Sequence, residues 1–215
     1  MSKEEEERFM SSTMESRAAM STTPSFVTAA DHVAGPGQGN WTYEDYAAIP
    51  DDGKRYEVVD GVLFMTPAPD IEHQEIVGEI FAHLRDYIKL TGMGKVFVAP
   101  VDVRLNARTI VQPDVLVILN AHLERIAEKR IVGAPDLVVE VASPATKEHD
   151  RDKKRAAYAL AGVPEYWIVD PAERNVEVFV LEAGMYHSVG IFHGRQNISS
   201  KIAAGLPAFV EQFFP

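Results

Sequence analysis

Two spacings of hydrophobic residues mark the expected elements along this chain. In residues 71–91 apolar side chains recur every four positions from Ile76 to Ile88, which predicts an amphipathic helix that ends at Gly92. Short apolar runs bounded by Gly, Pro or Asn predict strands. These runs are RYEVVDGVLFMTP, KVFVAPVDVRL (one strand or a pair), QPDVLVIL, APDLVVEVAS, EYWIVDP, NVEVFVLE and MYHSVGIF. Strands on both sides of a long helix predict an α/β or α+β fold with a mixed sheet.

Local signals add turns and shorter helices to this outline. The pair Asp60-Gly61 lies between two apolar runs and predicts a type I′ hairpin. The segment TYEDYAAIP predicts a short helix that Pro50 stops, and residues 122–131 predict a helical turn or loop. A second helix is expected over residues 146–161, and LPAFVEQFF predicts a short terminal helix.

The first 40 residues differ in composition from the rest of the chain. They are rich in Ser, Thr, Glu, Ala and Gly, lack periodicity and end in GPGQGN. The sequence therefore predicts a disordered extension over residues 1–40 and one domain over residues 41–215. No internal repeat is present.

The composition limits the chemistry that the domain can carry. The 215 residues include no cysteine, which excludes disulfides, thiolate zinc sites and cysteine nucleophiles. A metal would need oxygen or imidazole ligands, which favour magnesium or manganese. No apolar run approaches the ~20 residues that span a bilayer, and the start MSKEEEERFM is acidic, so we expect a cytoplasmic protein without a membrane segment. The net charge of −11 counts against nucleic-acid binding but suits carboxylates gathered around a cation.

Two apolar strands each carry one acid where a core strand would have none. Asp114 follows Pro113 in VQPDVLVI, and Glu140 follows a run of Val and Leu in PDLVVEVAS. A carboxylate in such a strand is costly to bury unless it is paired or binds a cation. Two carboxylates on neighbouring strands, with a backbone carbonyl, supply the ligands that Mg²⁺ prefers. Asp114 could instead merely shape the entry to its strand.

The predicted helix after Glu140 brings a lysine toward these acids. Asp150, Lys154 and Tyr158 are spaced at i, i+4 and i+8, so they share one helix face. Lys154 could orient a water and stabilise charge on a phosphate in the transition state. The alternatives are that the run RDKKR is a solvated helix face, or that Lys153 is the lysine that acts.

These residues belong to an ordered set of motifs that resembles a known family. The motifs are RYEVVDGVL, the Pro and His of PAPDIEHQ, DVRL, VQPDVLVI, GAPDLVVEVASPAT, the 150–154–158 Asp–Lys–Tyr set and GVPEYWIVDP. They cover roughly residues 42–180 and resemble the Uma-two-type restriction endonucleases of the PD-(D/E)XK nuclease superfamily. The resemblance implies a restriction-endonuclease-like mixed β-sheet flanked by helices. It also implies Asp114 and Glu140 as metal ligands and Lys154 as the catalytic lysine. The chain departs from the superfamily's E-x-K because Ala142 follows Val141.

The resemblance implies further site residues. Glu57 matches a position for a third metal-site carboxylate, although it could pair with Arg55 or Arg104 on a sheet surface instead. His73 matches a position for a catalytic base or a ligand. The remaining expected members are the Val141 carbonyl as a metal ligand, and Gln112, Asp150 and Tyr158 as supporting residues.

The function expected from these features is metal-dependent hydrolysis of phosphodiester bonds. The resemblance implies DNA as the substrate, Mg²⁺ as the cofactor with Mn²⁺ as the alternative, and a homodimer by analogy with restriction enzymes. Two other readings remain open. One is a non-catalytic regulatory or interaction module on the same fold, which the acidic net charge favours. The other is a metal-dependent phosphoesterase that acts on smaller substrates.

Overall fold

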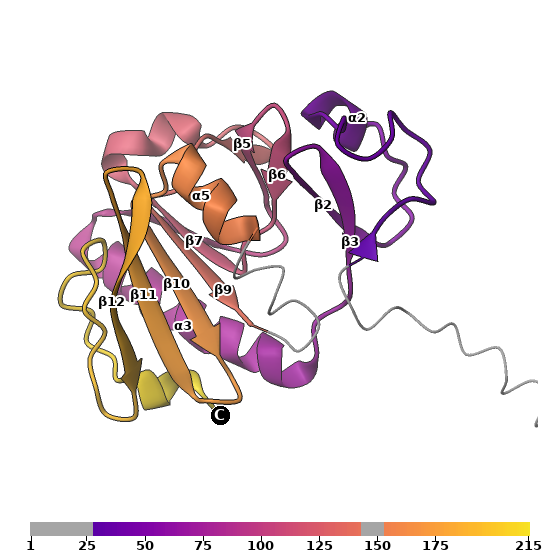
Figure 1. Cartoon of the computed structure of the whole chain (residues 1–215). Helices are drawn as coiled ribbons and strands as arrows, with labels where there is room; N and C mark the ends of the chain where they lie inside the picture. Colours follow the sequence, from indigo (N-terminus) through magenta and orange to yellow (C-terminus); the bar gives the residue numbers. More distant parts are fainter. Residues whose placement is uncertain (1–27, 143–152) are drawn as a thin grey trace, which may run out of the picture.

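The described part of the chain forms two mixed sheets of six strands each (Figure 1). The computed structural model describes residues 28–142 and 153–215. The first sheet has the order β1-β3-β2-β6-β5-β8 and the second β12-β11-β10-β9-β7-β4, with the bounds that follow. The first sheet contains β1 (Thr28–Ala29), β2 (Arg55–Val59), β3 (Val62–Thr66), β5 (Asp102–Asn106), β6 (Thr109–Val111) and β8 (Arg130–Val132). The second contains β4 (Gly94–Val98), β7 (Val115–Leu119), β9 (Leu137–Val141), β10 (Glu165–Asp170), β11 (Asn175–Glu182) and β12 (Met185–His193). The helices among these residues are α2 (Tyr43–Ala47), α3 (Ile71–Thr91), α5 (Arg155–Ala161) and the 3-10 helices η1 (Asn120–Arg125) and η3 (Val210–Phe213).

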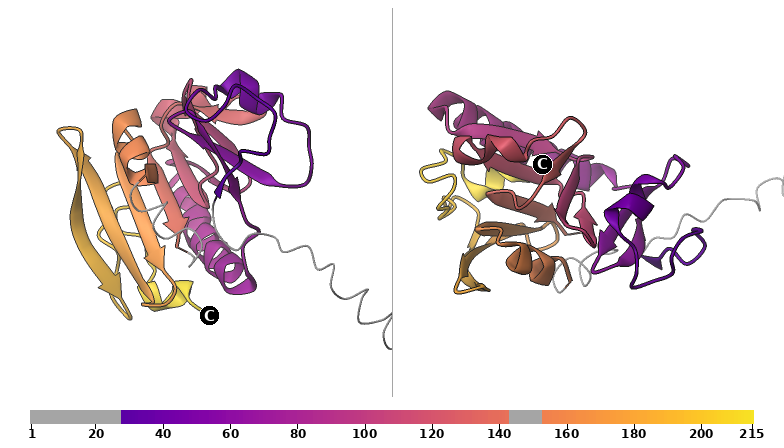
Figure 2. Two further views of the ribbon diagram at one scale, coloured as in Figure 1. Left: turned by 45° about the vertical axis from the view of Figure 1, so that its right-hand side comes forward. Right: turned by 90° about the horizontal axis from the view of Figure 1, so that it is seen from above.

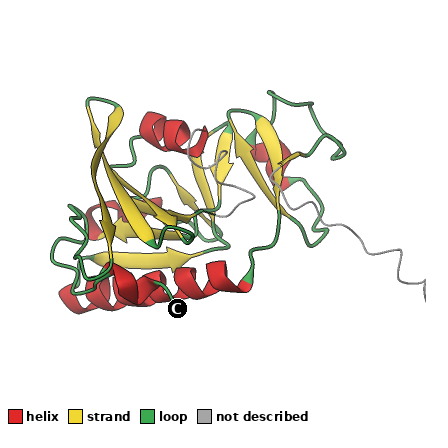
Figure 3. Ribbon diagram, turned by 60° about the horizontal axis from the view of Figure 1, so that its bottom comes forward, coloured by secondary structure: helices red, strands yellow, loops and turns green. Residues whose placement is uncertain are grey.

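Helix α3 covers one face of the second sheet (Figure 3). Its buried face runs from Ile76 to Ile88, as the spacing predicts, and packs on β7 and β9 side chains such as Val115 and Val139. Asp70 caps the helix by accepting from the His73 N–H, and Gly92 ends it in the left-handed conformation with a φ of 64°. Neither α3 nor any other helix in the described part of the chain has the long apolar stretch that crossing a membrane requires.

Helix α5 packs on the opposite face of the second sheet, next to the first sheet (Figure 2). Tyr158 of α5 shares this second core with Leu116 and Val138 of the second sheet and with Val59 of the first. Side chains alternate between the two faces along a strand. In β9, therefore, Val138 and Glu140 point toward α5, while Leu137, Val139 and Val141 point toward α3.

The β2–β3 hairpin turns at Asp60 and Gly61, whose φ values of 48° and 75° fit the predicted type I′ turn. Its outer face forms a third core with Trp41 and α2. Residues from 28 onward also belong to this core. Strand β1 pairs with β3, Ala30 is 1% exposed, and Gln38 bonds the backbone of Leu63 at 2.8 and 3.3 Å.

The boundary expected at residue 40 is therefore wrong for residues 28–40, while residues 1–27 lie outside the described part. The polar composition of residues 28–40 concealed contacts that are made through backbone pairing and a few buried side chains.

The expected α+β class is correct, but the strands divide between two sheets instead of one. KVFVAPVDVRL splits into β4 and β5, which belong to different sheets. Strands β6 and β8 were not expected, because each has only 3 residues and no clear alternation. Of the helix expected over residues 146–161, the structure describes the part from residue 153 and assigns α5 from Arg155.

Candidate active site

The two acids singled out in apolar strands lie side by side at one end of the second sheet. In the antiparallel pair β7–β9, Val115 is the register partner of Val139, so the next position along each strand brings Asp114 beside Glu140. Asp114 is 8% exposed and Glu140 is 3% exposed. Both carboxylates are thus withdrawn from water, and each needs polar partners.

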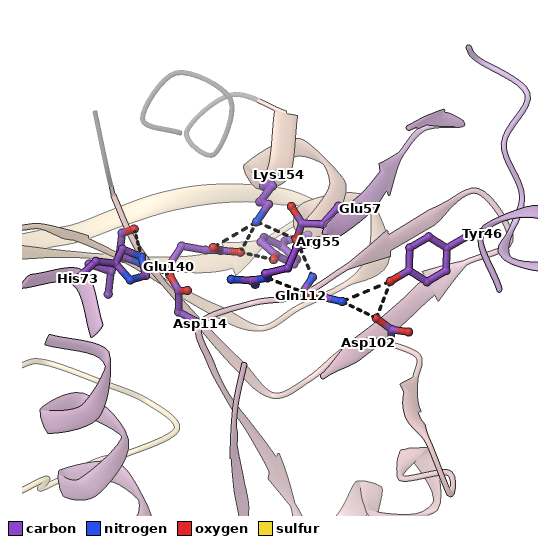
Figure 4. A network of polar contacts seen from close by, with 11 residues as sticks. Tyr46, Arg55, Glu57, His73, Asp102, Gln112, Asp114, Glu140 and Lys154 are labelled. Carbon is purple, nitrogen blue, oxygen red and sulfur yellow. Dashed lines mark hydrogen bonds and ion pairs between the residues drawn. The ribbon is translucent and has the colours of Figure 1, made fainter. Parts of the chain in front are cut away.

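Lys154 contacts Glu140 from the beginning of α5 (Figure 4). Its Nζ lies 3.1 and 3.3 Å from the two carboxylate oxygens of Glu140 and 3.1 Å from Glu57 Oε1. The Lys154 side chain is only 5% exposed. A lysine on a solvated helix face would be exposed, so the structure excludes that reading for Lys154. Lys153 is exposed and places its Nζ 4.8 Å from the ring centre of Phe64.

Tyr158 approaches the same carboxylate one helical turn later. Its hydroxyl donates to Glu140 Oε1 at 2.6 Å, and the residue is fully buried. Burial, followed by the charge of Glu140, raises the pKa of Tyr158 well above its usual value. Tyr158 is therefore a hydrogen-bond donor that orients Glu140. Asp150, the third member of the expected helix face, lies outside the described residues.

Glu57 joins the first sheet to the lysine. Its Oε1 accepts from the backbone N–H of Gln112 at 2.6 Å and lies 3.1 Å from Lys154 Nζ. The alternative ion pairs on a sheet surface are not formed. Arg55 Nε donates to Gln112 Oε1 at 3.1 Å instead, and Arg104 pairs with Glu44 at 3.6 Å.

Gln112 extends the polar network away from Lys154 (Figure 4). Its side-chain Nε2 donates to Asp102 Oδ1 at 2.9 Å and to the Tyr46 hydroxyl at 3.3 Å. Tyr46 in turn donates to Asp102 Oδ1 at 2.8 Å, and burial together with the Asp102 charge raises the pKa of Tyr46. Sequence reasoning did not select Tyr46, Asp102 or Arg55. The only signal was that Asp102 begins the motif DVRL.

His73 lies on the other side of Asp114, at the start of α3. Its Nε2 is 3.1 Å from the Val141 carbonyl oxygen and 3.3 Å from Asp114 Oδ2. A carbonyl only accepts, so this Nε2 carries a proton. Burial alone would lower the pKa of His73, but the hydrogen bond and charge of Asp114, with the Val141 carbonyl, outweigh it and the pKa is raised. The buried Nδ1 has no hydrogen-bond partner in the described part of the chain.

The oxygen donors at this end of the sheet suit a hard divalent cation. Asp114 Oδ2 accepts from the Val141 N–H at 2.8 Å, so the Asp114 carboxylate and the Val141 backbone are held together. Within residues 28–142 and 153–215, no three His, Asp or Glu side chains surround one point. Magnesium commonly uses only one or two carboxylates and takes its other oxygens from water and phosphate. Asp114, Glu140 and the Val141 carbonyl fit that pattern, and Glu140 shares the Lys154 ammonium with Glu57.

Comparisons with known proteins identify the family and the fold. The sequence profile of the Uma2 family, described as "Putative restriction endonuclease", matches residues 43–208. Among solved structures, the chain is similar to a protein from Anabaena variabilis ATCC 29413 that is described as a putative nuclease belonging to DUF820. The TM-score is 0.68 at 19% identity, over 81% of this chain and 97% of that chain. This likeness confirms the restriction-endonuclease-like fold. A comparison with curated proteins found no match.

Proposed function

The chain belongs to the Uma2 family, and on that premise we propose that it hydrolyses phosphodiester bonds in DNA with the help of a divalent cation. Asp114, Glu140 and the Val141 carbonyl would hold Mg²⁺, or Mn²⁺ in its place. The family description supports a nuclease-type activity. The cation and the DNA substrate are proposed here in addition to that activity. The hard oxygen donors, and the lysine beside them, support both.

The observation that carries the proposal is the buried contact between Lys154 and Glu140. The Lys154 ammonium lies 3.1 Å from an oxygen of Glu57 and 3.1 Å from an oxygen of Glu140, and all three side chains are 5% exposed or less. Burying three charged groups costs free energy that apolar residues of similar size would avoid. Such an arrangement is typical of sites where charge is needed for chemistry.

The site residues have different roles in the proposed reaction. Asp114 and Glu140 would hold the cation, which when bound would polarise the phosphodiester as a Lewis acid. Lys154, fixed by Glu57 and Glu140, donates to the phosphate oxygens as negative charge develops in the transition state. Tyr158 keeps the Glu140 carboxylate in one orientation through its 2.6 Å hydrogen bond. Because His73 Nε2 donates to Val141 and Asp114, we assign His73 a positioning role in place of the expected base or ligand role.

A homodimer is part of the proposal, with β12 as the contact strand. In the described part of the chain β12 is one of the two edge strands of the second sheet, and β4 is the other. It exposes Met185, Val189 and Ile191 by 62%, 44% and 54%. Two antiparallel copies of such an edge can pair their backbones around a twofold axis. Sedimentation equilibrium should give a dimer for the wild type and a monomer for Ile191→Lys. A monomeric wild type would refute this contact.

The test of the nuclease activity is a cleavage screen. Single-stranded, duplex and branched DNA and RNA are incubated with Mg²⁺, with Mn²⁺ or with a chelator. We expect cleavage of DNA that requires the cation and is lost in Glu140→Gln and Lys154→Met. The control is Lys89→Met, which removes an exposed lysine on α3. Activity retained in Glu140→Gln would point to a contaminating nuclease and overturn the site assignment.

The non-catalytic module has one observation in its favour. The Lys154 ammonium pairs with both Glu57 and Glu140, so part of the carboxylate charge at the site is already balanced within the protein. That alternative predicts no cleavage in the screen and no stabilisation by either cation. Hydrolysis of a small phosphodiester such as bis(p-nitrophenyl) phosphate, without cleavage of any nucleic acid, would favour the phosphoesterase instead.

A further inference from the structure

A pocket of about 530 Å³ lies beside the proposed active site. The β2–β3 hairpin, the β5–β6 turn and α5 line it. Its apolar lining includes Val59, Val62, Phe64, Ala157 and Leu160. The exposed cations Arg108 and Lys153 stand at its edge. The volume is in the range of small-molecule sites.

The pocket and the active site share one face of the hairpin. Glu57 and Val59 are two residues apart on β2, so their side chains point to the same side. Phe64 of β3 is the register partner of Glu57 and therefore stands on that side as well. Two strand residues span about 7 Å. The pocket residue Val59 therefore lies about 7 Å along β2 from Glu57, which contacts Lys154.

The lining chemistry suits a flat group that packs on apolar side chains and has a negative charge next to it. Leu160 lines the pocket and is 84% exposed, so it offers apolar surface that a bound group can cover. Arg108 is already engaged, because its guanidinium bonds the Gly39 carbonyl at 2.8 Å and lies 3.4 Å from Asp60. Lys153 has only the Phe64 ring as a described contact, so its ammonium remains available for an anion.

We propose that this pocket receives one unpaired nucleobase of the strand whose phosphodiester lies at Lys154, with a neighbouring phosphate on Lys153. The inference rests on the proposed nuclease function and narrows its substrate to single-stranded or unpaired nucleic acid. A base inside a duplex cannot enter such a pocket without leaving its stack. An unpaired base can lie against apolar side chains at no such cost. The pocket also offers a cation where the net charge of −11 would otherwise repel the strand.

The test measures binding separately from turnover. Binding of a fluorescein-labelled oligothymidylate is followed by fluorescence anisotropy in the presence of a chelator. We expect Leu160→Glu to weaken binding at least about fivefold, as the loss of one base contact would. The matched control is Leu90→Glu, because Leu90 is 87% exposed on α3, across the second sheet from α5. Lys153→Ala should also weaken binding, whereas Lys89→Ala on α3 should not.

A second measurement places the base. A series of oligothymidylates, each with one abasic nucleotide at a different position, is tested for binding. In the wild type the affinity should fall at one position of the series. In Leu160→Glu no position should show this fall. Equal effects of Leu160→Glu and Leu90→Glu, or no binding by the wild type, would overturn the pocket assignment. Cleavage of duplex and single strands at equal rates would overturn it while the nuclease function stands. If binding depends on the pocket but no cation-dependent cleavage occurs, the pocket assignment stands and the proposed nuclease function is refuted.

Discussion

Lys154→Met should destabilise the metal-free protein strongly at neutral pH. The Lys154 Nζ lies 3.1 Å from an oxygen of Glu57 and from an oxygen of Glu140, so those two oxygens are at most twice that distance apart. At an effective dielectric of ~20, each lysine–glutamate attraction is about 5 kcal/mol and the glutamate–glutamate repulsion is at least about 2–3 kcal/mol. These gross energies are largely offset by desolvation. Removing one partner of a buried pair costs about 3–5 kcal/mol in proteins, and we expect that loss here.

Urea denaturation, followed by the fluorescence of the buried Trp167, measures the loss. The exposed Lys153 is the matched control, since Lys153→Met removes only its contact with Phe64, worth about 0.5–1 kcal/mol. Glu57→Gln keeps an oxygen that can accept from the Gln112 N–H while removing the charge. Added to Lys154→Met, it should therefore recover part of the lost stability, with a coupling energy of about 0.5–3 kcal/mol.

The pH dependence of the Lys154→Met variant provides a second check. Without the lysine, burial and repulsion should raise the pKa of one glutamate in the folded state above its unfolded value. The folded protein then binds more protons than the unfolded chain, so the variant should regain stability as the pH falls from 8 toward 5. Strictly additive losses for Lys154→Met and Glu57→Gln, or a loss of less than about 1 kcal/mol for Lys154→Met, would refute the coupled buried charges.

Three further predictions concern the cation, His73 and the beginning of the domain. Mg²⁺ or Mn²⁺ at ~100 times its dissociation constant should stabilise the protein by about 2.7 kcal/mol, which raises the melting temperature by roughly 5–10 °C. The gain should shrink as pH falls and vanish in Asp114→Asn, and an unchanged response in that variant would exclude Asp114 as a ligand. NMR titration without metal should give His73 a pKa above ~6.5 that drops in Asp114→Asn. Because that pKa is raised, its stabilising contribution is complete below ~6.5 and is lost as pH rises through the folded-state pKa. A chain beginning at residue 41 should melt at a lower temperature than one beginning at residue 28, since it lacks β1 and the buried Ala30; equal melting would show that these contacts contribute nothing.

Features that depend on neighbouring residues could be predicted from the sequence. The buried face of α3 follows from its four-residue spacing, and its end follows from the left-handed φ that Gly92 adopts easily. The hairpin follows from the same property at Asp60-Gly61. Glu140 was identifiable as a functional candidate because a lone acid in an apolar strand needs a partner. The i+4 spacing of Lys154 and Tyr158 likewise predicted that both could face one group, and both contact Glu140.

Only the tertiary structure decided which distant segments meet. Glu57 lies 83 positions before Glu140 in the sequence, and no local pattern indicates that both contact Lys154. The network from Gln112 to Asp102 and Tyr46 depends on the pairing of short strands that carry little periodicity of their own. Residues 28–40 looked like a tail because a few backbone bonds and one or two buried side chains leave almost no trace in composition. A residue's own neighbours limit its conformation, but the partner of a buried charge is set by how the two sheets pack.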